Sequence, residues 1–294
     1  MFFYIFALIN NALLKKMKKL SLMLFALLFT VAAFAQKREK IKGSKNVTIT
    51  QKEVQLFKTL EVEDNIEIYL IKGTSQRLEI EADDNLHDII KTEVTATTLR
   101  IYTSKEVSGA KKLTVRVTYI DGLKQITAKH EALVYAVNEL ALDSITVKNL
   151  DFSKSFLNVK SNNFGLVMND KSKAEINVKA NSTTIELSKN ADLKALIASP
   201  AVKVDMYQKT TAAIEGDADT VQVRIDNNAV FTGKKFTVKN MDLTAESYTK
   251  SSVMIIETLT LSASGKTEIG LYGTPATVTM KKFADSAVIA KKED

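Results

Sequence analysis

A 19-residue period over residues 138–225 constrains the fold of this chain more than any other feature of its sequence. Each of its 5 copies contains two short runs in which apolar and polar residues alternate, a pattern typical of β-strands with one buried face. Of the 30 positions that the alternation places inward, 24 are apolar, against 4 of the 20 positions between them. A unit this short cannot bury its own apolar face, so successive copies must stack. The first inward positions of the copies are Asn138, Leu157, Ile176, Ala195 and Ile214.

The repeat predicts an all-β fold: a right-handed parallel β-helix, or β-solenoid, with coils of about 19 residues over residues 121–288. After residue 225 the apolar pairs continue at uneven spacing, as expected of terminal coils that have one face without a neighbour. Turns are expected where Asn, Ser and Gly interrupt the alternation. These positions include Asn162-Asn163, Asn181-Ser182, Asn227-Asn228 and Ser264-Gly265.

Residues 47–120 predict an N-terminal strand-rich cap region, because short alternating runs are separated there by turn residues without a fixed period. Strands are expected over residues 94–102 and 113–120. The residues Leu86, Ile89 and Ile90 have the spacing of a short helix, and the preceding Asp83-Asp84-Asn85 is expected to cap it. At the other end of the chain, residues 289–294 form a charged tail.

Residues 1–35 predict a leader rather than part of the fold. Met17-Lys18-Lys19, the apolar residues 20–34 and Ala33-Phe34-Ala35 have the order of a secretory signal peptide over residues 17–35, removed after Ala35. Residues 1–16 are then upstream sequence. The alternative is a retained anchor, but lysines divide the segment into two runs, each short for a spanning helix of roughly 20 residues. Residues 36–46 are highly charged and are expected to be a flexible lead-in.

Composition excludes several classes of function. The net charge of +7 falls to +3 without the four lysines of the leader, and the remaining lysines are dispersed, so nucleic-acid binding is not expected. The chain has 0 cysteines, which excludes both disulfides and a lipid-modified cysteine after the leader. No later apolar run is long enough for an integral membrane span. The expected location is therefore extracytoplasmic: the periplasm, or the cell surface or medium, of a Gram-negative bacterium.

Candidate chemical sites are few. The two histidines, His87 and His130, are expected in the short helix and in a turn, and without cysteines a zinc site would need converging carboxylates. Only Glu186 and Asp205 place two acids on adjacent coils of one outward row, flanked by Lys203 and Arg224. Glycoside hydrolysis needs two placed carboxyl groups and calcium needs six or more oxygens, so this pair is thin support for a polysaccharide lyase or hydrolase.

Neither the acidic run nor the tyrosines define a site on their own. Asp83-Asp84-Asn85 lacks the alternating spacing and the distal Glu of a hand-type calcium loop. Sugar-binding surfaces favour exposed aromatic rings, and the candidates for a modest platform are Tyr207, Tyr248 and Tyr272 near predicted strand ends. The alternative is that each is an ordinary rim residue. We assign no catalytic, cofactor-binding or metal-ligating residue and expect no cofactor.

Residues 62–73, 78–86, 90–94 and 99–101, with the C-terminal Ser264-Gly265 and residues 271–275, resemble the auto-transporter adhesin, head GIN domain family. The resemblance covers roughly residues 50–287 and implies a secreted or surface-located β-solenoid with a strand-rich cap. In the family's small-residue turns this chain mostly has Asn or Ser. The resemblance transfers no functional residue.

The sequence therefore predicts a non-enzymatic, secreted or envelope-associated, adhesin-like module that binds glycan or a cell-envelope protein through its exterior. One alternative is the polysaccharide-active enzyme considered above, and another is a periplasmic scaffold protein. Self-association through the terminal coils is also expected to be possible, because a terminal coil presents unpaired strand edges.

Overall fold

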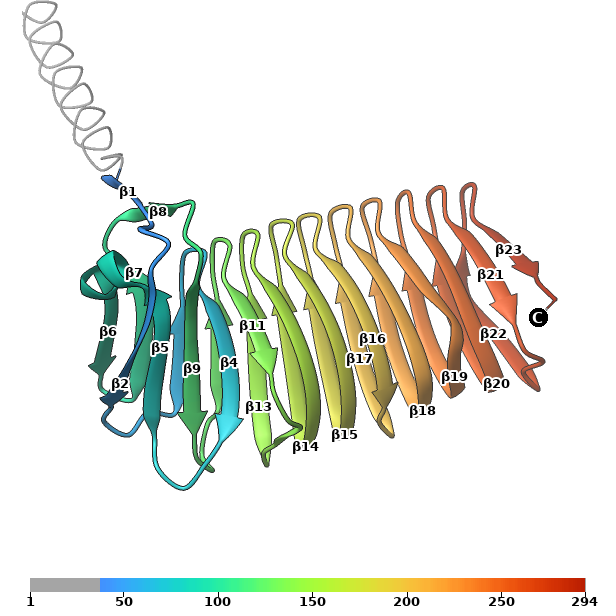
Figure 1. The fold of residues 1–294 in the computed structure, drawn as a ribbon. Helices are drawn as coiled ribbons and strands as arrows, with labels where there is room; N and C mark the ends of the chain where they lie inside the picture. Colours follow the sequence, from blue (N-terminus) through green and yellow to red (C-terminus); the bar gives the residue numbers. More distant parts are fainter. Residues whose placement is uncertain (1–37, 294) are drawn as a thin grey trace, which may run out of the picture. The chain divides into compact units, whose positions relative to one another are not determined.

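The computed structural model describes residues 38–293, so the predicted leader lies outside the described residues (Figure 1). Among the described residues, residues 41–293 belong to one compact unit, which contains the solenoid. Within residues 38–293, no helix is long and apolar enough to cross a membrane. The described chain is all-β apart from one 3-10 helix, η1 (Asp84–Ile89).

The first group of strands extends from the lead-in to the end of the cap. Its members are β1 (Lys40–Lys42), β2 (Val47–Glu53), β3 (Thr59–Val62), β4 (Glu67–Lys72), β5 (Arg77–Asp83), β6 (Ile90–Thr95), β7 (Thr98–Thr103), β8 (Glu106–Ser108) and β9 (Leu113–Tyr119).

The second group forms the remaining coils. Its members are β10 (Gln125–Ala128), β11 (Leu133–Ala136), β12 (Leu140–Ala141), β13 (Ser144–Asn149), β14 (Lys154–Met168), β15 (Lys173–Leu187), β16 (Asp192–Ala198), β17 (Ala201–Met206), β18 (Thr211–Ile225), β19 (Val230–Ala245), β20 (Lys250–Ala263), β21 (Glu268–Tyr272), β22 (Thr277–Phe283) and β23 (Val288–Lys291).

The coils stack into two walls of parallel strands (Figure 1). Wall A consists of β3, β10, β13, β17, β22 and the C-terminal halves of β14, β15, β18, β19 and β20. Wall B consists of β4, β11, β16, β21, β23 and the N-terminal halves of the same five long strands. The predicted β-solenoid is confirmed; its handedness stays a prediction.

The register between coils confirms the 19-residue period. Leu157 lies opposite Ile176, Ile176 opposite Ala195, and Ala195 opposite Ile214, so one buried column runs through four coils. Burial of apolar surface between stacked side chains stabilises the fold by about 25 cal/mol per Å². A single coil cannot bury this surface without its neighbours. The uneven spacing predicted towards the C-terminus is also present. Register shifts occur between Ala213 and Glu215 and between Gly233 and Thr237.

Two kinds of corner join the walls: turns between strands and bends within long strands. The sequence analysis predicted turns at both. Asn227-Asn228 forms a turn, as expected, with both residues at positive φ. At Asn162-Asn163 and Asn181-Ser182, however, the chain stays within β14 and β15. The strands bend there without leaving the ladder, and the amide of Asn181 donates a hydrogen bond to Asn162 at 3.0 Å.

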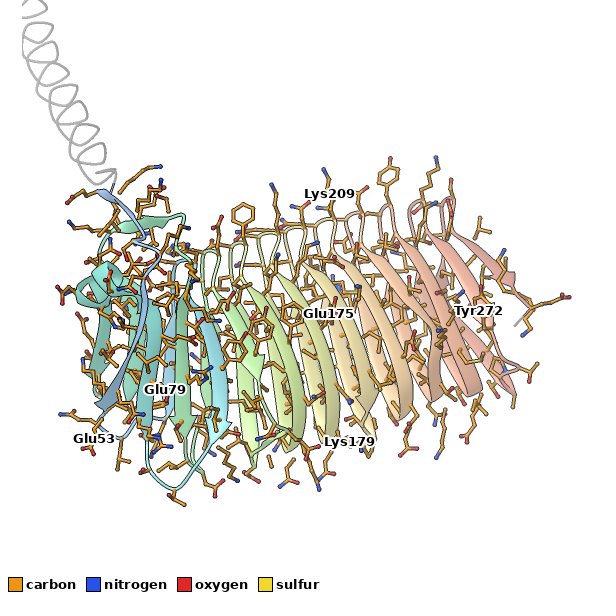
Figure 2. The ribbon with its side chains drawn as sticks, in the orientation of Figure 1. Glu53, Glu79, Glu175, Lys179, Lys209 and Tyr272 are labelled. Atoms are coloured by element: carbon orange, nitrogen blue, oxygen red, sulfur yellow. The ribbon has the colours of Figure 1, made fainter. Side chains whose placement is uncertain are left out.

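The turns at the opposite corner form a row whose residues lie in the left-handed region although none is glycine. The pairs are Asp170-Lys171, Lys189-Asn190, Gln208-Lys209 and Asn227-Asn228. Backbone hydrogen bonds join one turn to the next: the N–H of Lys171 donates to the carbonyl of Lys189 at 3.1 Å, and that of Lys209 to the carbonyl of Asn227 at 2.9 Å. The ladder therefore continues through the turns, and Lys209 projects from this row (Figure 2).

The cap is an insertion between the first coil, which contains β3 and β4, and the second coil, which contains β10 and β11. It is not a region that precedes the solenoid. Although the sequence analysis assigned residues 47–120 to the cap, β3 pairs with β10 and β4 with β11 in the parallel stack. Residues 73–124 connect these two coils and extend both walls: β7 pairs with β3, and β9 pairs with β4. Antiparallel strands then close the end: β6 pairs with β7, β5 pairs with β9, and β2 pairs with β5.

Three local predictions for the cap were wrong. The single strand expected over residues 94–102 is the hairpin β6–β7, because the chain reverses at Ala96, which has a positive φ of 53°. Ile90 begins β6 instead of ending the helix, so η1 is shorter than the apolar spacing indicated. Asp83 occupies the N-cap position but makes no side-chain capping bond.

Instead, Asp83-Asp84-Asn85 holds the segment that was expected to be flexible. The buried carboxylate of Asp83 accepts hydrogen bonds from the backbone N–H groups of Lys45 at 2.8 Å, Lys112 at 2.9 Å and Lys111 at 3.0 Å. Asn85 accepts from the N–H of Ser44. In addition, β1 pairs with β8. Residues 42–46 of the predicted lead-in therefore contact the cap closely, because Asp83 and Asn85 accept hydrogen bonds from backbone donors there.

Candidate functional site

A row of aromatic side chains lies on the outer face of wall B. Tyr69 of β4, Tyr135 of β11 and Phe156 of β14 occupy registered outward positions on three successive coils. Adjacent ring centroids are 5.0 Å apart, with interplanar angles of 14° and 7°. Because this separation exceeds the roughly 3.5–4 Å of direct carbon contact, the rings are offset and each leaves part of its face uncovered. We call these three residues the aromatic ladder.

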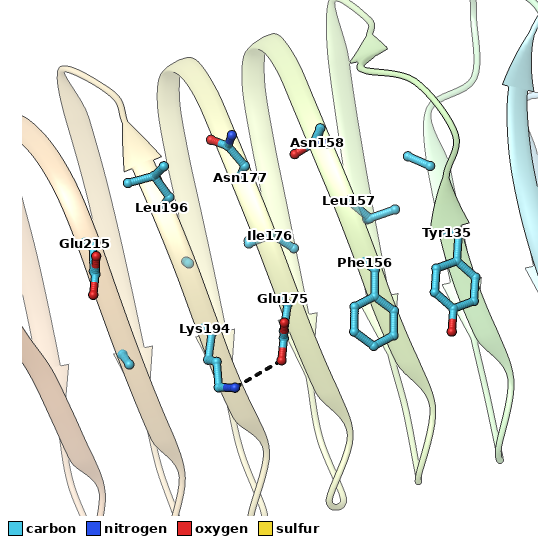
Figure 3. Close-up of a pocket in the computed structure, with 13 residues that line it drawn as sticks. Tyr135, Phe156, Leu157, Asn158, Glu175, Ile176, Asn177, Lys194, Leu196 and Glu215 are labelled. Carbon is cyan, nitrogen blue, oxygen red and sulfur yellow. Dashed lines mark hydrogen bonds and ion pairs between the residues drawn. The ribbon is translucent and has the colours of Figure 1, made fainter.

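Polar residues continue the column of the aromatic ladder on the next coils. Glu175 of β15 follows Phe156, and Lys194 of β16 follows Glu175. Lys194 Nζ lies 3.1 Å from Glu175 Oε1, and both side chains are more than half exposed (Figure 3). The next residue of the column is Ala213 of β18. Its small side chain projects little from the outer surface of wall B.

A second column borders the first, two residues further along each strand. It consists of Asn158, Asn177, Leu196 and Glu215 in register. Between the two columns lies an open trough of about 590 Å³ that begins beside Tyr135 and Phe156 (Figure 3). We call this space the wall B trough. Its floor is formed by the nearly buried Leu157, Ile176 and Ala195.

The wall B trough combines ring faces, side-chain amides and one ion pair without a cluster of carboxylates. Glu175 is paired with Lys194, and Glu215 lies 3.2 Å from the Nζ of Lys235. Burial raises the pKa of the Tyr135 hydroxyl, and the charge of Glu67 adds to this, so the hydroxyl stays protonated and able to donate. An arrangement of this kind binds an extended ligand through shallow contact and contains no pair of groups placed for acid–base chemistry.

The two histidines take part in separate contacts. His87 lies in η1, and its ring nitrogens are 2.9 Å and 3.1 Å from the hydroxyls of Thr48 and Thr50. His130 lies in a turn, as predicted, with its Nδ1 3.5 Å from Asp64 Oδ1. Over residues 38–293, no group of three or more His, Cys, Asp or Glu side chains is arranged to hold a metal ion.

Glu186 and Asp205 are adjacent on wall A, as the 19-residue register predicted. Lys203 Nζ lies 2.9 Å from Asp205 Oδ2, and this hydrogen bond is the main cause of a raised pKa for Lys203. Arg224, opposite Asp205 on the next coil, lies 3.3 Å from Glu246. The two acids therefore belong to a wall of alternating charges.

The tyrosines proposed from the sequence do not form one platform. Tyr207 and Tyr248 lie in turns that follow β17 and β19, whereas Tyr272 is the last residue of β21 on wall B (Figure 2). The guanidinium of Arg224 lies 5.9 Å from the centroid of the Tyr207 ring. The sequence analysis missed the aromatic ladder because its members are separated by 66 and 21 residues, outside the 19-residue period.

A charged cluster joins the cap to wall A and was also missed. Arg100 of β7 donates two hydrogen bonds to Glu63, at 3.0 Å and 2.9 Å, and Lys129 Nζ lies 3.6 Å from the same carboxylate. Burial would raise the pKa of Glu63, but the hydrogen bond with Arg100 and the two positive charges hold it below its ordinary value. The cluster is satisfied internally, so its role is to hold the inserted cap.

The described residues thus form a β-solenoid whose outer faces are walls of parallel strands, with the open wall B trough on one of them. The model of the family described as "Putative auto-transporter adhesin, head GIN domain" matches residues 56–275. The chain belongs to this family, whose description names an adhesin and no enzymatic activity. Its description suggests a surface or extracytoplasmic location. No curated protein matches the chain.

Several solved structures share the fold. One, described as a putative adhesin from Parabacteroides distasonis, has a TM-score of 0.64 at 18% identity, covering 87% of this chain and 98% of its own. Another, from Parabacteroides merdae and also described as a putative adhesin, has a TM-score of 0.61 at 15% identity, with 86% and 99% covered. A third, described as a putative lipid binding protein from Parabacteroides distasonis, has a TM-score of 0.57 at 14% identity, with 86% and 100% covered. At these identities the likeness concerns the fold alone.

Proposed function

We propose that the protein is a non-enzymatic, extracytoplasmic adhesion module that binds glycan chains along the outer face of wall B. The aromatic ladder beside the wall B trough is the observation that carries this proposal. Pyranose rings present apolar C–H faces that pack on aromatic faces, and their hydroxyls pair with amides such as those of Asn158 and Asn177. The location that we propose is the periplasm, cell surface or medium of a Gram-negative bacterium.

The wall B trough suits an extended glycan chain better than a single sugar. Its outward columns advance by one strand per coil, about 4.8 Å, so equivalent contacts recur along the wall. Each contact is shallow, and affinity must therefore come from several of them together. The ion pairs at Glu175 and Glu215 leave little unpaired charge in the trough, which favours a neutral or weakly charged glycan.

The test is a glycan and cell-binding screen of the purified protein, followed by affinity measurements on any positive ligand. Phe156→Ala removes the ring at the edge of the trough and is expected to weaken binding at least about tenfold, or 1.4 kcal/mol. Phe152→Ala is the matched control, because Phe152 is 54% exposed in the turn before the same strand and lies outside the trough. We expect this control to bind like the unchanged protein.

The same screen decides against the proposal if glycan binding is equal in both variants, or if the protein retains only an envelope protein. Binding through rings and amides should change little with salt, since screening acts mainly on exposed charges. A steep loss of affinity between low and physiological ionic strength would place the contact on the lysine-rich parts of the surface instead.

A further inference from the structure

The last coil of the solenoid exposes its core. On β22, the inward residues Val278, Met280 and Phe283 are 42%, 49% and 41% exposed. Their partners one coil earlier on β20 are Leu259, Leu261 and Ala263, and each of these is 0% exposed. The apolar columns of wall A therefore reach the end of the stack with nothing in the described chain above them. On β23, Val288 is also exposed, at 55%.

The backbone of this coil is unpaired along the same side. Among the described strands, β22 pairs only with β20, and β23 only with β21. A free edge beside exposed apolar side chains is the usual template for pairing with another chain, and proteins that avoid such pairing place charged side chains across the edge.

Three lysines of the last coil do not protect its edge in this way. Lys281 Nζ lies 3.3 Å from Asp242, two coils earlier, and Lys282 Nζ donates to the hydroxyl of Ser264 at 3.1 Å. Lys291 donates to the carbonyl of Gly273. All three side chains lean back along the solenoid, so like charges are kept away from a partner that approaches the end.

The opposite end of the solenoid is closed. On β7, the outermost parallel strand of wall A, the inward residues Leu99 and Ile101 are 0% exposed. Antiparallel strands and η1, with its buried Leu86 and Ile89, cover that end. In a head-to-tail contact, the exposed apolar C-terminal end of one copy would meet the covered cap end of the next. In a contact between two C-terminal ends, both surfaces are apolar and have the same shape.

We infer that two copies of this chain join end to end through β22 and β23 in a closed two-fold dimer. A two-fold axis perpendicular to the walls sets β22 antiparallel to β22 of the second copy and β23 antiparallel to β23. The solenoid already accepts antiparallel strands at its other end, where β5 and β6 close the stack. Such an isologous contact covers both free edges and both sets of core columns, and it cannot grow further.

This inference does not depend on glycan binding. If both hold, each dimer presents two wall B troughs, and their combined binding to a repeating glycan exceeds that of one trough through effective concentration.

The mass of the purified protein in solution is the first test. Light scattering and sedimentation at micromolar concentration should give twice the mass of one chain. Met280→Lys should weaken the dimer at least about a hundredfold, because each copy would place an unpaired charge in the interface. Ile49→Lys is the matched control: Ile49 is an exposed isoleucine on β2, at the closed end, and its variant should remain dimeric.

Cross-linking keeps the test independent of whether Met280→Lys disturbs the last coil. The chain has 0 cysteines, so a single introduced cysteine reports only on its own copy in the partner. In an antiparallel pair of two β22 strands only the residue at the two-fold axis faces its own copy within disulfide reach, so single cysteines are introduced in turn at each position from Thr277 to Phe283. One of these variants should form a covalent dimer on oxidation, whereas Thr232→Cys, on wall B, should not.

Three results would overturn the inference. The first is a monomer at all concentrations. The second is a ladder of species larger than dimers, which would show head-to-tail growth. The third is a dimer that no cysteine of the β22 series cross-links, or that Ile49→Lys disrupts, since this would place the contact on another surface.

Discussion

Replacing Asp83 by Asn should loosen the cap much more than the loss of one charge at the surface. The side chain is fully buried, and its two oxygens accept from the N–H groups of Lys45, Lys111 and Lys112. In Asn one of these oxygens becomes an NH₂ group, which faces at least one N–H donor directly. A buried donor left unsatisfied costs about 1–3 kcal/mol, and the remaining bonds lose their ionic character. We expect a total loss of about 2–4 kcal/mol.

Hydrogen–deuterium exchange is the appropriate assay, because stacked coils and an inserted cap need not unfold together. Amide exchange at Lys45, Lys111 and Lys112 should accelerate roughly 30- to 800-fold, the equivalent of that free energy. Asp88→Asn is the control, since it makes the same chemical change at an exposed position of η1. Equal exchange in the two variants would refute the view that Asp83 holds residues 42–46 against the cap.

The acid dependence of the cap has the same origin. Burial would raise the pKa of Asp83, but the backbone donors of Lys111, Lys45 and Lys112 hold it below its ordinary value. The unfolded chain then binds a proton at higher pH than the folded chain, so stability falls as the pH decreases. The loss should begin near the unperturbed Asp pKa of about 4 and end below the lowered folded value. Asp83→Asn should abolish this part of the pH dependence.

Other substitutions test the packing. Gly216→Ala should cost about 2–4 kcal/mol in urea unfolding, because Gly216 has a φ of 112° and a Cβ there would lie 2.0 Å from the Ile197 carbonyl. Burial raises the pKa of Tyr119 to about 12, so the melting temperature should fall as the pH rises from about 10 towards that value, and Tyr119→Phe should remove this alkaline loss. Leu261→Ala should cost about 2–5 kcal/mol, whereas Val278→Ala, one coil later and exposed, should cost less than about 1 kcal/mol at concentrations where the chain is monomeric.

The sequence predicted those features that repeat at constant spacing. Leu157, Ile176 and Ala195 form a column because each is 19 residues from the next, and the same spacing correctly placed Glu186 beside Asp205. Asp83 could not be assigned, since its three donors lie 28–38 residues away in segments without a shared pattern. No period in the sequence shows that residues 73–124 leave the stack after β4 and that the next coil begins at β10.

The candidate site could not be predicted from the sequence for a related reason. The aromatic ladder needs Tyr69 of the first coil next to Tyr135 of the second, and the inserted cap separates them in sequence. Phe156 then follows Tyr135 at a 21-residue step, which a search at 19 residues passes over. An alignment of outward aromatic positions across unequal coils would have found this row, but only once the insertion was known.

The constant register from β14 to β18 has a consequence for how such a chain can evolve. Lys154, Lys173 and Asp192 begin equivalent turns of the stack, so loss of residues 173–191 would bring β14 directly onto β16 with every column still matched. Duplication of the same stretch would lengthen the walls by one step and leave the insertion at one end and the open coil at the other unaltered. Descendants can therefore gain or lose whole coils, which changes the length and the side-chain pattern of their outer surface. The hydrophobic interior then needs no compensating mutation.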